Sequence, residues 1–164
     1  MTRSARAEAD VLFIGVDAVA DNLRRASRRA GGNALFGRLA LAEAPGELSG
    51  LADRLTVLFP WGSLLAAVCG RAPAGLAALR GLCRPGAEVR FLFELASDPA
   101  ELLRAHAAAG FHLAARAVSV EEARALPTSW AKRLGYSGRR RAFWELRGSA
   151  GPQPGPSARA GGNR

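Results

Sequence analysis

The chain has 164 residues, 49% of them hydrophobic, and a formal net charge of +9 that comes from 22 arginines and a single lysine, Lys132. This length suits one domain with one sizeable core. The sequence has no apolar run long enough to span a membrane, no signal-peptide pattern, and two cysteines without metal-ligand spacing, so we expect a cytoplasmic protein with no membrane partner and no metal site.

The apolar pattern changes its period along the chain, and the changes predict alternating strands and helices. Residues 10–17, "DVLFIGVD", form an apolar run that ends in an acid, which is typical of a parallel strand buried on both faces. A helical pattern covers 18–30 and ends at Gly31 and Gly32. Further strands are expected at 34–43, 54–60, 87–95, 111–119 and 141–148, and further helices at 63–70, 72–83, 98–110, 120–126 and 128–136.

This alternation predicts an α/β fold with an open, mostly parallel sheet. The ordered domain is expected to span residues 10–148. The basic stretch at 1–9 and the Pro/Gly-rich stretch at 149–164 are expected to be disordered. In sheets of this kind ligands bind beyond the carboxyl ends of the strands, so the residues that follow each strand are the first candidates for a site.

Two acids stand at such strand ends. Asp17 ends the first predicted strand, where its carboxylate could accept hydrogen bonds from a pair of ribose hydroxyls; the alternative is a helix N-cap or a solvated loop acid. Glu43 ends the second predicted strand, after Ala42, where it could meet an adenine amino group or simply face solvent. Neither acid alone identifies a ligand.

The end of the third predicted strand carries a tryptophan, in the phrase "LFPWGSLL" at 58–65. Pro60 fixes its own φ and supplies no hydrogen-bond donor, so a carbonyl beside it, such as that of Phe59, is left free for an exocyclic amine. Trp61 then offers a flat face on which a nucleobase could stack. The alternative is a core tryptophan that closes the end of the sheet, and the residues alone leave both interpretations open.

A second tryptophan lies in the most basic part of the chain. Residues 128–148 hold six cations and one anion. Trp130 shares a predicted helix with Lys132 and Arg133, and cations beside an aromatic ring suit RNA, whose backbone needs positive charge and whose bases need a stacking surface. The alternative is an amphipathic surface helix with a buried tryptophan. RNA binding is favoured by the three consecutive arginines that follow, Arg139, Arg140 and Arg141.

Five phrases, taken together and in this order, resemble the 16S rRNA adenine-N(1) methyltransferases that confer aminoglycoside resistance. They are "FIGVDAVADNL", "LAEAPGELSGL", "LFPWGSLL", "LCRPGAEV" and "SWAKRL…GRRRAFW", and the resemblance covers roughly residues 10–148. The pairing of FPWG with WAKR is specific, whereas GVD or AE alone is not. The resemblance implies a Rossmann-like class I methyltransferase fold, S-adenosylmethionine as the cofactor, 16S rRNA in the 30S ribosomal subunit as the substrate, and a monomer.

The resemblance also implies roles for individual residues. Trp61 and Trp130 match the two tryptophans that hold the flipped decoding-site adenine between them, and Phe59 and Pro60 accompany the first. The cofactor site is matched by Asp17, Ala42, Glu43, Thr128 and Ser129. The rRNA-contacting cations are matched by Lys132, Arg133, Arg139 and Arg141, and we group Arg140 with them.

In one respect the sequence departs from the family pattern. The family begins with a strand that lies at the centre of the sheet and a glycine-rich D-x-G-x-G loop around the methionine end of the cofactor, and no such loop occurs in this sequence. Either the natural start lies upstream or the chain is a shortened relative, and we expect weak cofactor binding by this chain alone. Three functions therefore stay open: an rRNA methyltransferase, a non-catalytic RNA- or ribosome-binding remnant of that family, and a small-molecule methyltransferase.

A methyltransferase sheet without its first strand has a definite strand order. We expect the strand at 34–40 at one edge, followed by 11–17, 54–59 and 87–95, with 140–147 antiparallel between 87–95 and 111–118.

Overall fold

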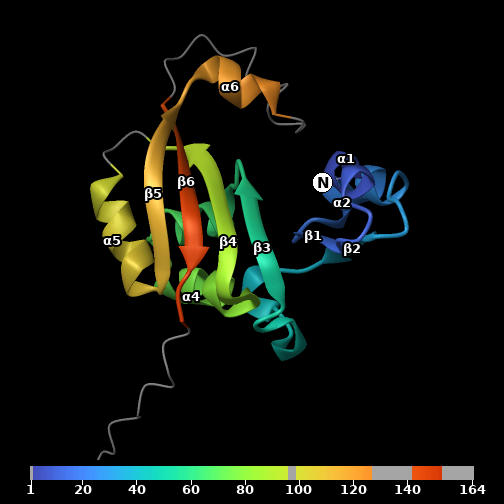
Figure 1. Ribbon diagram of the computed structural model, residues 1–164, viewed down its shortest axis with the longest axis horizontal. Coiled ribbons are helices and arrows are strands. Elements are labelled where there is room, and N and C mark those ends of the chain that lie inside the picture. The colour runs from blue at the N-terminus through green and yellow to red at the C-terminus, as the bar shows by residue number, and fades with distance from the viewer. Residues whose placement is uncertain (1, 96–98, 127–141, 153–164) are drawn as a thin grey trace, which may run out of the picture. The chain divides into compact units, whose positions relative to one another are not determined.

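The structure of the protein, a computed structural model, describes residues 2–95, 99–126 and 142–152 (Figure 1). Strands and helices alternate along it as the sequence predicts. Contacts divide the chain into two compact units, Met1–Pro45 and Gly46–Arg164. The domain expected over 10–148 therefore draws on both units.

The first unit is built on a two-stranded parallel sheet. β1 (Phe13–Asp17) pairs with β2 (Ala34–Arg38), and α2 (Ala20–Ser27) connects the two strands and packs against them. The expected pairing of these two strands is confirmed. A short 3-10 helix, η1 (Leu41–Glu43), follows β2, so the second strand ends earlier than the sequence suggests.

Residues near the N-terminus form a helix, α1 (Thr2–Ala7), in the stretch where we expected disorder. Ala5 is buried, and the side-chain amide of Asn33 donates to the carbonyl oxygens of Ala5, Glu8 and Val11 at 2.8–2.9 Å. These bonds fasten the end of α1 to the start of β2. The contact joins residues far apart in the sequence, so the composition of residues 1–9 gave no sign of it.

The second unit holds a four-stranded sheet in the order β3–β4–β6–β5 (Figure 1). β3 (Ala52–Leu58) and β4 (Cys83–Glu94) are parallel, whereas β6 (Phe143–Ala150) runs antiparallel between β4 and β5 (Phe111–Val118). This order and these directions are the expected ones. β6 extends two residues into the stretch assigned to the disordered tail, because its last residue is buried and pairs with the first residue of β5.

The expected pairing between 11–17 and 54–59 is wrong for the described residues. β1 pairs with β2 and β3 pairs with β4, and the two pairs belong to separate sheets. A strand inside a parallel sheet supplies hydrogen-bond partners to both neighbours. No described strand occupies such a position beside β1 and β3, so each keeps one edge without a strand partner.

One face of the larger sheet is apolar and packed. α3 (Gly62–Val68), α4 (Pro73–Leu82) and α5 (Ala100–Ala108) each contribute buried side chains to the core of this unit. The buried imidazole of His106 on α5 lies against the rings of Phe91 and Phe111, with centroid distances of 5.6 and 6.0 Å. This packing gives His106 a structural place in the core.

The opposite face of that sheet carries charges that pair with one another. The carboxylate of Glu145 on β6 is buried, and it accepts hydrogen bonds from Arg90 on β4 at 2.6 Å and from Arg116 on β5 at 2.9 Å. Arg116 also reaches Glu122 on α6 (Val120–Ala125) at 2.7 Å. α6 begins with a capping box, in which Ser119 and Glu122 satisfy each other's backbone N–H groups.

No single helix in the described ranges is long and apolar enough to cross a membrane. α3 and α4 reach such a length and composition only as a pair, and they meet at a bend of 84°.

Candidate functional site

The chain turns sharply directly after β3. Among the described residues Phe59 is the one non-glycine residue with a positive φ, at 49°, and Gly62 has a φ of 59°. Trp61 between them is extended, with φ −140° and ψ 170°. A left-handed backbone at a bulky residue costs about 1–3 kcal/mol, so neighbouring structure must hold this turn in place.

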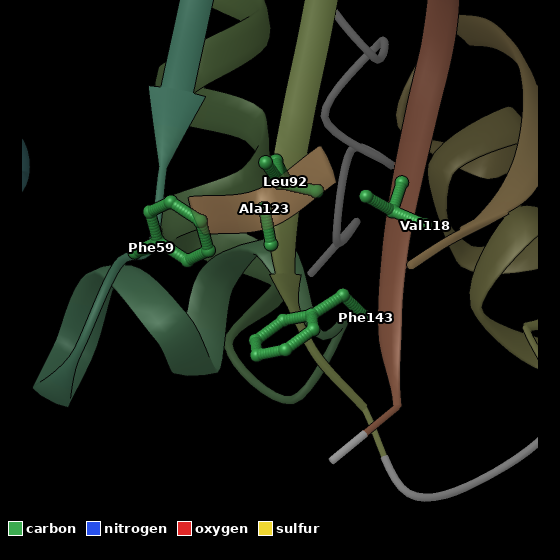
Figure 2. Packing of buried hydrophobic residues seen from close by; sticks show 5 residues of the cluster. All are labelled: Phe59, Leu92, Val118, Ala123 and Phe143. Atoms are coloured by element: carbon green, nitrogen blue, oxygen red, sulfur yellow. The ribbon is translucent and has the colours of Figure 1, made fainter. Parts of the chain in front are cut away.

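Two contacts hold Phe59. Its N–H donates to the carbonyl oxygen of Leu92 on β4 at 2.7 Å, which extends the strand pairing by one residue. Its ring is buried in a cluster with Leu92, Val118, Ala123 and Phe143 (Figure 2). The rings of Phe59 and Phe143 meet edge to face, with centroids 6.0 Å apart and planes at 89°.

Trp61 is held differently from Phe59, because it does not enter the core. It is 60% exposed, the second most exposed of the large hydrophobic residues of this unit that the structure describes. The interpretation of Trp61 as a core residue is therefore excluded. An exposed indole at the carboxyl end of a parallel strand is placed where a flat ligand can stack.

A hydrogen-bond acceptor lies beside this indole. No described N–H or O–H donates to the carbonyl oxygen of Pro60. A free carbonyl next to an exposed aromatic ring offers both a stacking face and an acceptor for an exocyclic amine. The exposed ring is one of the two alternatives given for Trp61, whereas the carbonyl described here is that of Pro60 itself and not that of the neighbour named from the sequence.

The third tryptophan has a different environment. Trp144 is half-buried in β6, where it lies opposite Phe93 on β4 and Ala117 on β5. It belongs to the sheet and not to a turn.

In the first unit, Asp17 ends β1 as expected and is half-buried. Its Oδ1 accepts from the N–H of Val19 at 2.8 Å and its Oδ2 accepts from the side-chain amide of Asn22 at 3.0 Å. Asp17 is not the N-cap of α2, which is Val19 without a side-chain cap; its carboxylate instead holds the short turn between β1 and α2. Each carboxylate oxygen can accept a second hydrogen bond, so these bonds leave room for a ribose hydroxyl.

Ala42 and Glu43 lie in η1, and both are exposed. They stand beyond the carboxyl end of β2, the neighbour of the strand that ends at Asp17. The structure thus brings Asp17, Ala42 and Glu43 to the ends of two paired strands within one unit. These are positions where parallel sheets bind ligands.

The remaining expected site residues lie outside the described residues. They are Thr128, Ser129, Trp130, Lys132, Arg133, Arg139, Arg140 and Arg141. Leu126, the last described residue before this stretch, packs against the cluster around Phe59.

Two residues of interest were missed by the sequence analysis. Asn22 escaped attention because its link to Asp17 depends on how the loop turns into α2, although an amide in the first turn after a strand-end acid is a usable signal. Phe143 gave no signal beyond its place in an apolar run, because its contact with Phe59 depends on the pairing of β4 with β6.

Comparison with known proteins identifies relatives of this chain. A family model described as "NpmA: 16S rRNA (adenine(1408)-N(1))-methyltransferase" matches residues 1–97. The 16S rRNA (adenine(1408)-N(1))-methyltransferase of Streptoalloteichus tenebrarius is 32% identical over 174 aligned residues, which cover 90% of this chain and 80% of that protein. The protein of the same name from Streptoalloteichus hindustanus is 31% identical over the same shares.

Solved structures give the same picture. The 16S rRNA methyltransferase KamB superposes with a TM-score of 0.75 at 30% identity, over 92% of this chain and 82% of that one. A variant of the 16S rRNA (adenine(1408)-N(1))-methyltransferase from Catenulisporales acidiphilia, solved with its cosubstrate SAM, gives a TM-score of 0.74 at 26% identity, over 94% of this chain and 82% of that one.

Proposed function

Because this chain belongs to the family of 16S rRNA (adenine(1408)-N(1))-methyltransferases, we propose that it transfers a methyl group from S-adenosylmethionine to N1 of an adenine in 16S rRNA. The substrate is the decoding-site adenine of the 30S subunit, and the protein acts on it in the cytoplasm as a monomer. Its methylation gives the cell resistance to aminoglycosides, and a related protein, NpmB1, is an aminoglycoside resistance methyltransferase.

The exposed indole of Trp61 is the observation that carries this proposal. A protein domain rarely exposes a tryptophan at the end of a core strand, and here a left-handed Phe59 keeps the residue in place. Enzymes that modify a base must take it out of its helix, and aromatic faces offset the loss of stacking. Trp61 supplies one such face, and we assign the second to Trp130.

The carbonyl oxygen of Pro60 selects the base. The 6-amino group of adenine is a donor, and the free acceptor beside Trp61 suits it. A base held by its amino group and its flat face presents N1 in a fixed direction, and this orientation is the main contribution of the protein to the rate.

The chemistry needs no general base before attack. The cofactor supplies a methyl group on a positively charged sulfur, so the N1 lone pair forms the new C–N bond while the C–S bond breaks. N1 of adenine carries no proton, which leaves the protein with positioning alone. Among the described residues, Phe59, Pro60 and Trp61 perform that positioning.

The cofactor fits the residues of the first unit. Asp17 can accept from a ribose hydroxyl through the lone pairs that Val19 and Asn22 do not use. Ala42 and Glu43 would lie along the adenine, where the exposed carboxylate of Glu43 can accept from the amino group. We assign Thr128 and Ser129 to the same ligand, and the cations Lys132, Arg133, Arg139, Arg140 and Arg141 to rRNA phosphates.

Methylation of isolated 30S subunits tests the proposal. A methyl group on N1 blocks the pairing edge of adenine, so reverse transcription of the treated 16S rRNA should stop beside the modified base. We expect Trp61→Ala to abolish most of this signal while the unfolding midpoint stays near that of the unchanged protein. Loss of one stacked base contact is worth about 1–3 kcal/mol of binding.

Trp144→Ala is the matched control, since Trp144 is half-buried in β6. It should lower the unfolding midpoint while the protein that remains folded still methylates. A Trp61→Ala protein that unfolds early yet methylates normally would contradict the proposal. A chain that binds 30S subunits but never modifies them would instead be the non-catalytic RNA-binding remnant, and one that methylates only small molecules would be the third alternative.

A further inference from the structure

The turn that carries Trp61 is anchored to the core through Phe59 alone among its described side chains. Trp61 itself is exposed and makes no described ring contact, so among the described residues its position depends on the backbone turn from which its side chain leaves the chain. Phe59 carries the left-handed backbone conformation, and Phe59 is the member of the turn whose side chain is buried. Whatever fixes the ring of Phe59 therefore fixes where Trp61 points.

Phe143 is the aromatic residue that fixes that ring. It is the first residue of β6 and is 2% exposed, and its ring meets Phe59 edge to face at 6.0 Å (Figure 2). Edge-to-face pairs have a directional preference that aliphatic contacts lack, because the positive ring edge faces the negative ring face. A replacement of similar volume fills the space without holding the direction.

The same cluster receives other chain segments. Ala123 of α6 is buried in it, and Leu126 at the end of that helix packs against it. Phe143 and Leu126 flank, in the sequence, the stretch to which we assign Trp130. The end of β3, the end of α6 and the start of β6 therefore share one anchor.

We propose that Phe143 is a positioning residue for methyl transfer, which acts through its edge-to-face contact with Phe59 to hold Trp61 in the direction that receives the base. This inference rests on the proposed function, because the direction of Trp61 matters to a reaction only if Trp61 stacks on the substrate. Phe143 itself lies in the core and touches no substrate.

Phe111 provides a matched control. It is the first residue of β5, it is fully buried, and its ring meets Phe91 edge to face at 5.7 Å and 82°. It pairs with Ala150 at the other end of β6, far along the strand from Phe143. Phe143→Leu and Phe111→Leu thus make the same chemical change at comparable burial. Only the first removes a ring contact with Phe59, the residue that begins the Trp61 turn.

The first measurement follows Trp61 directly. In protein labelled with 5-fluorotryptophan, the three fluorine signals are assigned with single Trp→Phe variants. We expect Phe143→Leu to shift or broaden the Trp61 signal, and Phe111→Leu to leave it unchanged. An unchanged Trp61 signal in Phe143→Leu, or an equal change in both variants, would overturn the inference. This readout does not depend on whether the chain methylates anything.

The second measurement is the single-turnover rate of methyl transfer to 30S subunits, scaled to the folded fraction. Phe143→Leu should slow it by about 10- to 100-fold, the loss expected when a reacting group is displaced by about 1 Å, whereas Phe111→Leu should not slow it. The double variant Phe143→Leu/Trp61→Ala should be no slower than Trp61→Ala alone, because both changes remove the same interaction. Additive losses would mean that Phe143 acts elsewhere.

The experiments distinguish failure of the proposed function from failure of the positioning role of Phe143. A wild-type chain that does not methylate overturns the proposed function, and the fluorine signal still decides whether Phe143 holds Trp61. A chain that methylates, with a Trp61 signal and rate that ignore Phe143→Leu, overturns this inference alone. If leucine at position 143 unfolds the protein, Phe143→Met is measured against Phe111→Met, since methionine adapts to irregular space.

Discussion

The buried carboxylate of Glu145 shows how a single residue ties three strands together. It is 1% exposed, and its partners Arg90 and Arg116 come from the strands on either side. Burial acts to raise the pKa of the Glu145 carboxyl, but the hydrogen bonds from Arg116 and Arg90 outweigh it, and the pKa is lowered. The folded state therefore favours the charged form.

This lowered pKa gives a pH dependence with a definite sign. A carboxyl whose pKa is lower in the folded than in the unfolded protein contributes stability above its unfolded pKa, and loses it as the pH falls through the folded pKa. We expect the free energy of unfolding, measured by urea titration, to fall as the pH drops below about 4.5, the ordinary pKa of a glutamate carboxyl. In Glu145→Gln this contribution to the acid loss should disappear.

At pH 7 the same substitution should cost about 1.5–3 kcal/mol, the worth of hydrogen bonds to a charged group. Glu88→Gln is the control, because Glu88 is exposed and pairs with Arg54 and Arg147 on the surface. It should cost less than about 1 kcal/mol. Equal losses in the two variants would show that the burial of Glu145 has no energetic role.

Among the elements, the pairing of β5 with β6 leaves no space at one position. A Cβ added to Gly148 would lie 1.9 Å from the carbonyl oxygen of His112 on β5. The two backbones approach so closely there that a side chain would push them apart.

We therefore expect Gly148→Ala to lower the free energy of unfolding by at least the 1–3 kcal/mol typical of overpacking, roughly estimated. Gly81→Ala on α4 is the control, since nothing lies within 4 Å of the added Cβ. That change should stabilise the protein by about 0.5–1 kcal/mol, because alanine suits a helix better than glycine. Thermal or urea unfolding measures both, and a neutral Gly148→Ala would mean that the strands can shift at no cost.

These elements also show what the sequence could predict. The runs at 10–17, 54–60 and 87–95 are apolar and bounded by turn residues, so the strand positions followed from local pattern, whereas the pairings followed from the family resemblance. α1 did not, because it is held by Asn33, far along the chain. The pairing of 11–17 with 54–59 was wrong because the partner of a strand depends on which other strands are present, which no pattern within either strand reveals.

The candidate site, like the fold, could be predicted from the sequence only in part. The Pro-Trp-Gly phrase after a core strand was enough to predict an exposed Trp61 as one of two alternatives. The left-handed backbone of Phe59 and the contact with Phe143 were not predictable, because both arise from packing between segments distant in sequence. The second bonding partner of Asp17 likewise required the conformation of the loop before α2.

At the scale of the whole molecule, the two units differ in how much core they hold. In the described part of the first unit, the buried hydrophobic residues are Ala5 and Ala34, and six large hydrophobic residues are exposed: Val11, Leu12, Ile14, Val16, Val19 and Leu35. In the described part of the second unit, all five phenylalanine rings are buried, together with aliphatic residues such as Val89, Leu92 and Leu146. A two-stranded sheet with so little burial is marginally stable by itself.

Native-state hydrogen exchange should reflect this difference. We expect the amides of β1 and β2 to exchange through local opening at a lower free energy than those of β4 and β6. Because we assign the cofactor to Asp17 and Glu43, adding S-adenosylmethionine should slow exchange in β1 and leave β6 unchanged. Equal protection in the two sheets without ligand would show that they open together.

Binding to the ribosome should depend on salt through the cations of residues 128–148. Arg139, Arg140 and Arg141 changed together to alanine should make the slope of log affinity for 30S subunits against log salt shallower by about 2–3. Arg25, Arg28 and Arg29, exposed in or just after α2, provide a control with the same change of net charge. The same slope change in both variants would indicate a general charge effect rather than contacts at that stretch.

The position of β6 in the sheet has a consequence for folding during synthesis of the protein. β6 is the last described strand to be synthesised, yet it lies between β4 and β5, so neither of those strands has its antiparallel partner until residues 143–150 have left the ribosome. Translation proceeds from the N-terminus, so the backbone groups along this edge of β4 have no strand partner until β6 has been made. Phe143 arrives with β6, so the turn at Trp61 gains its support late in synthesis.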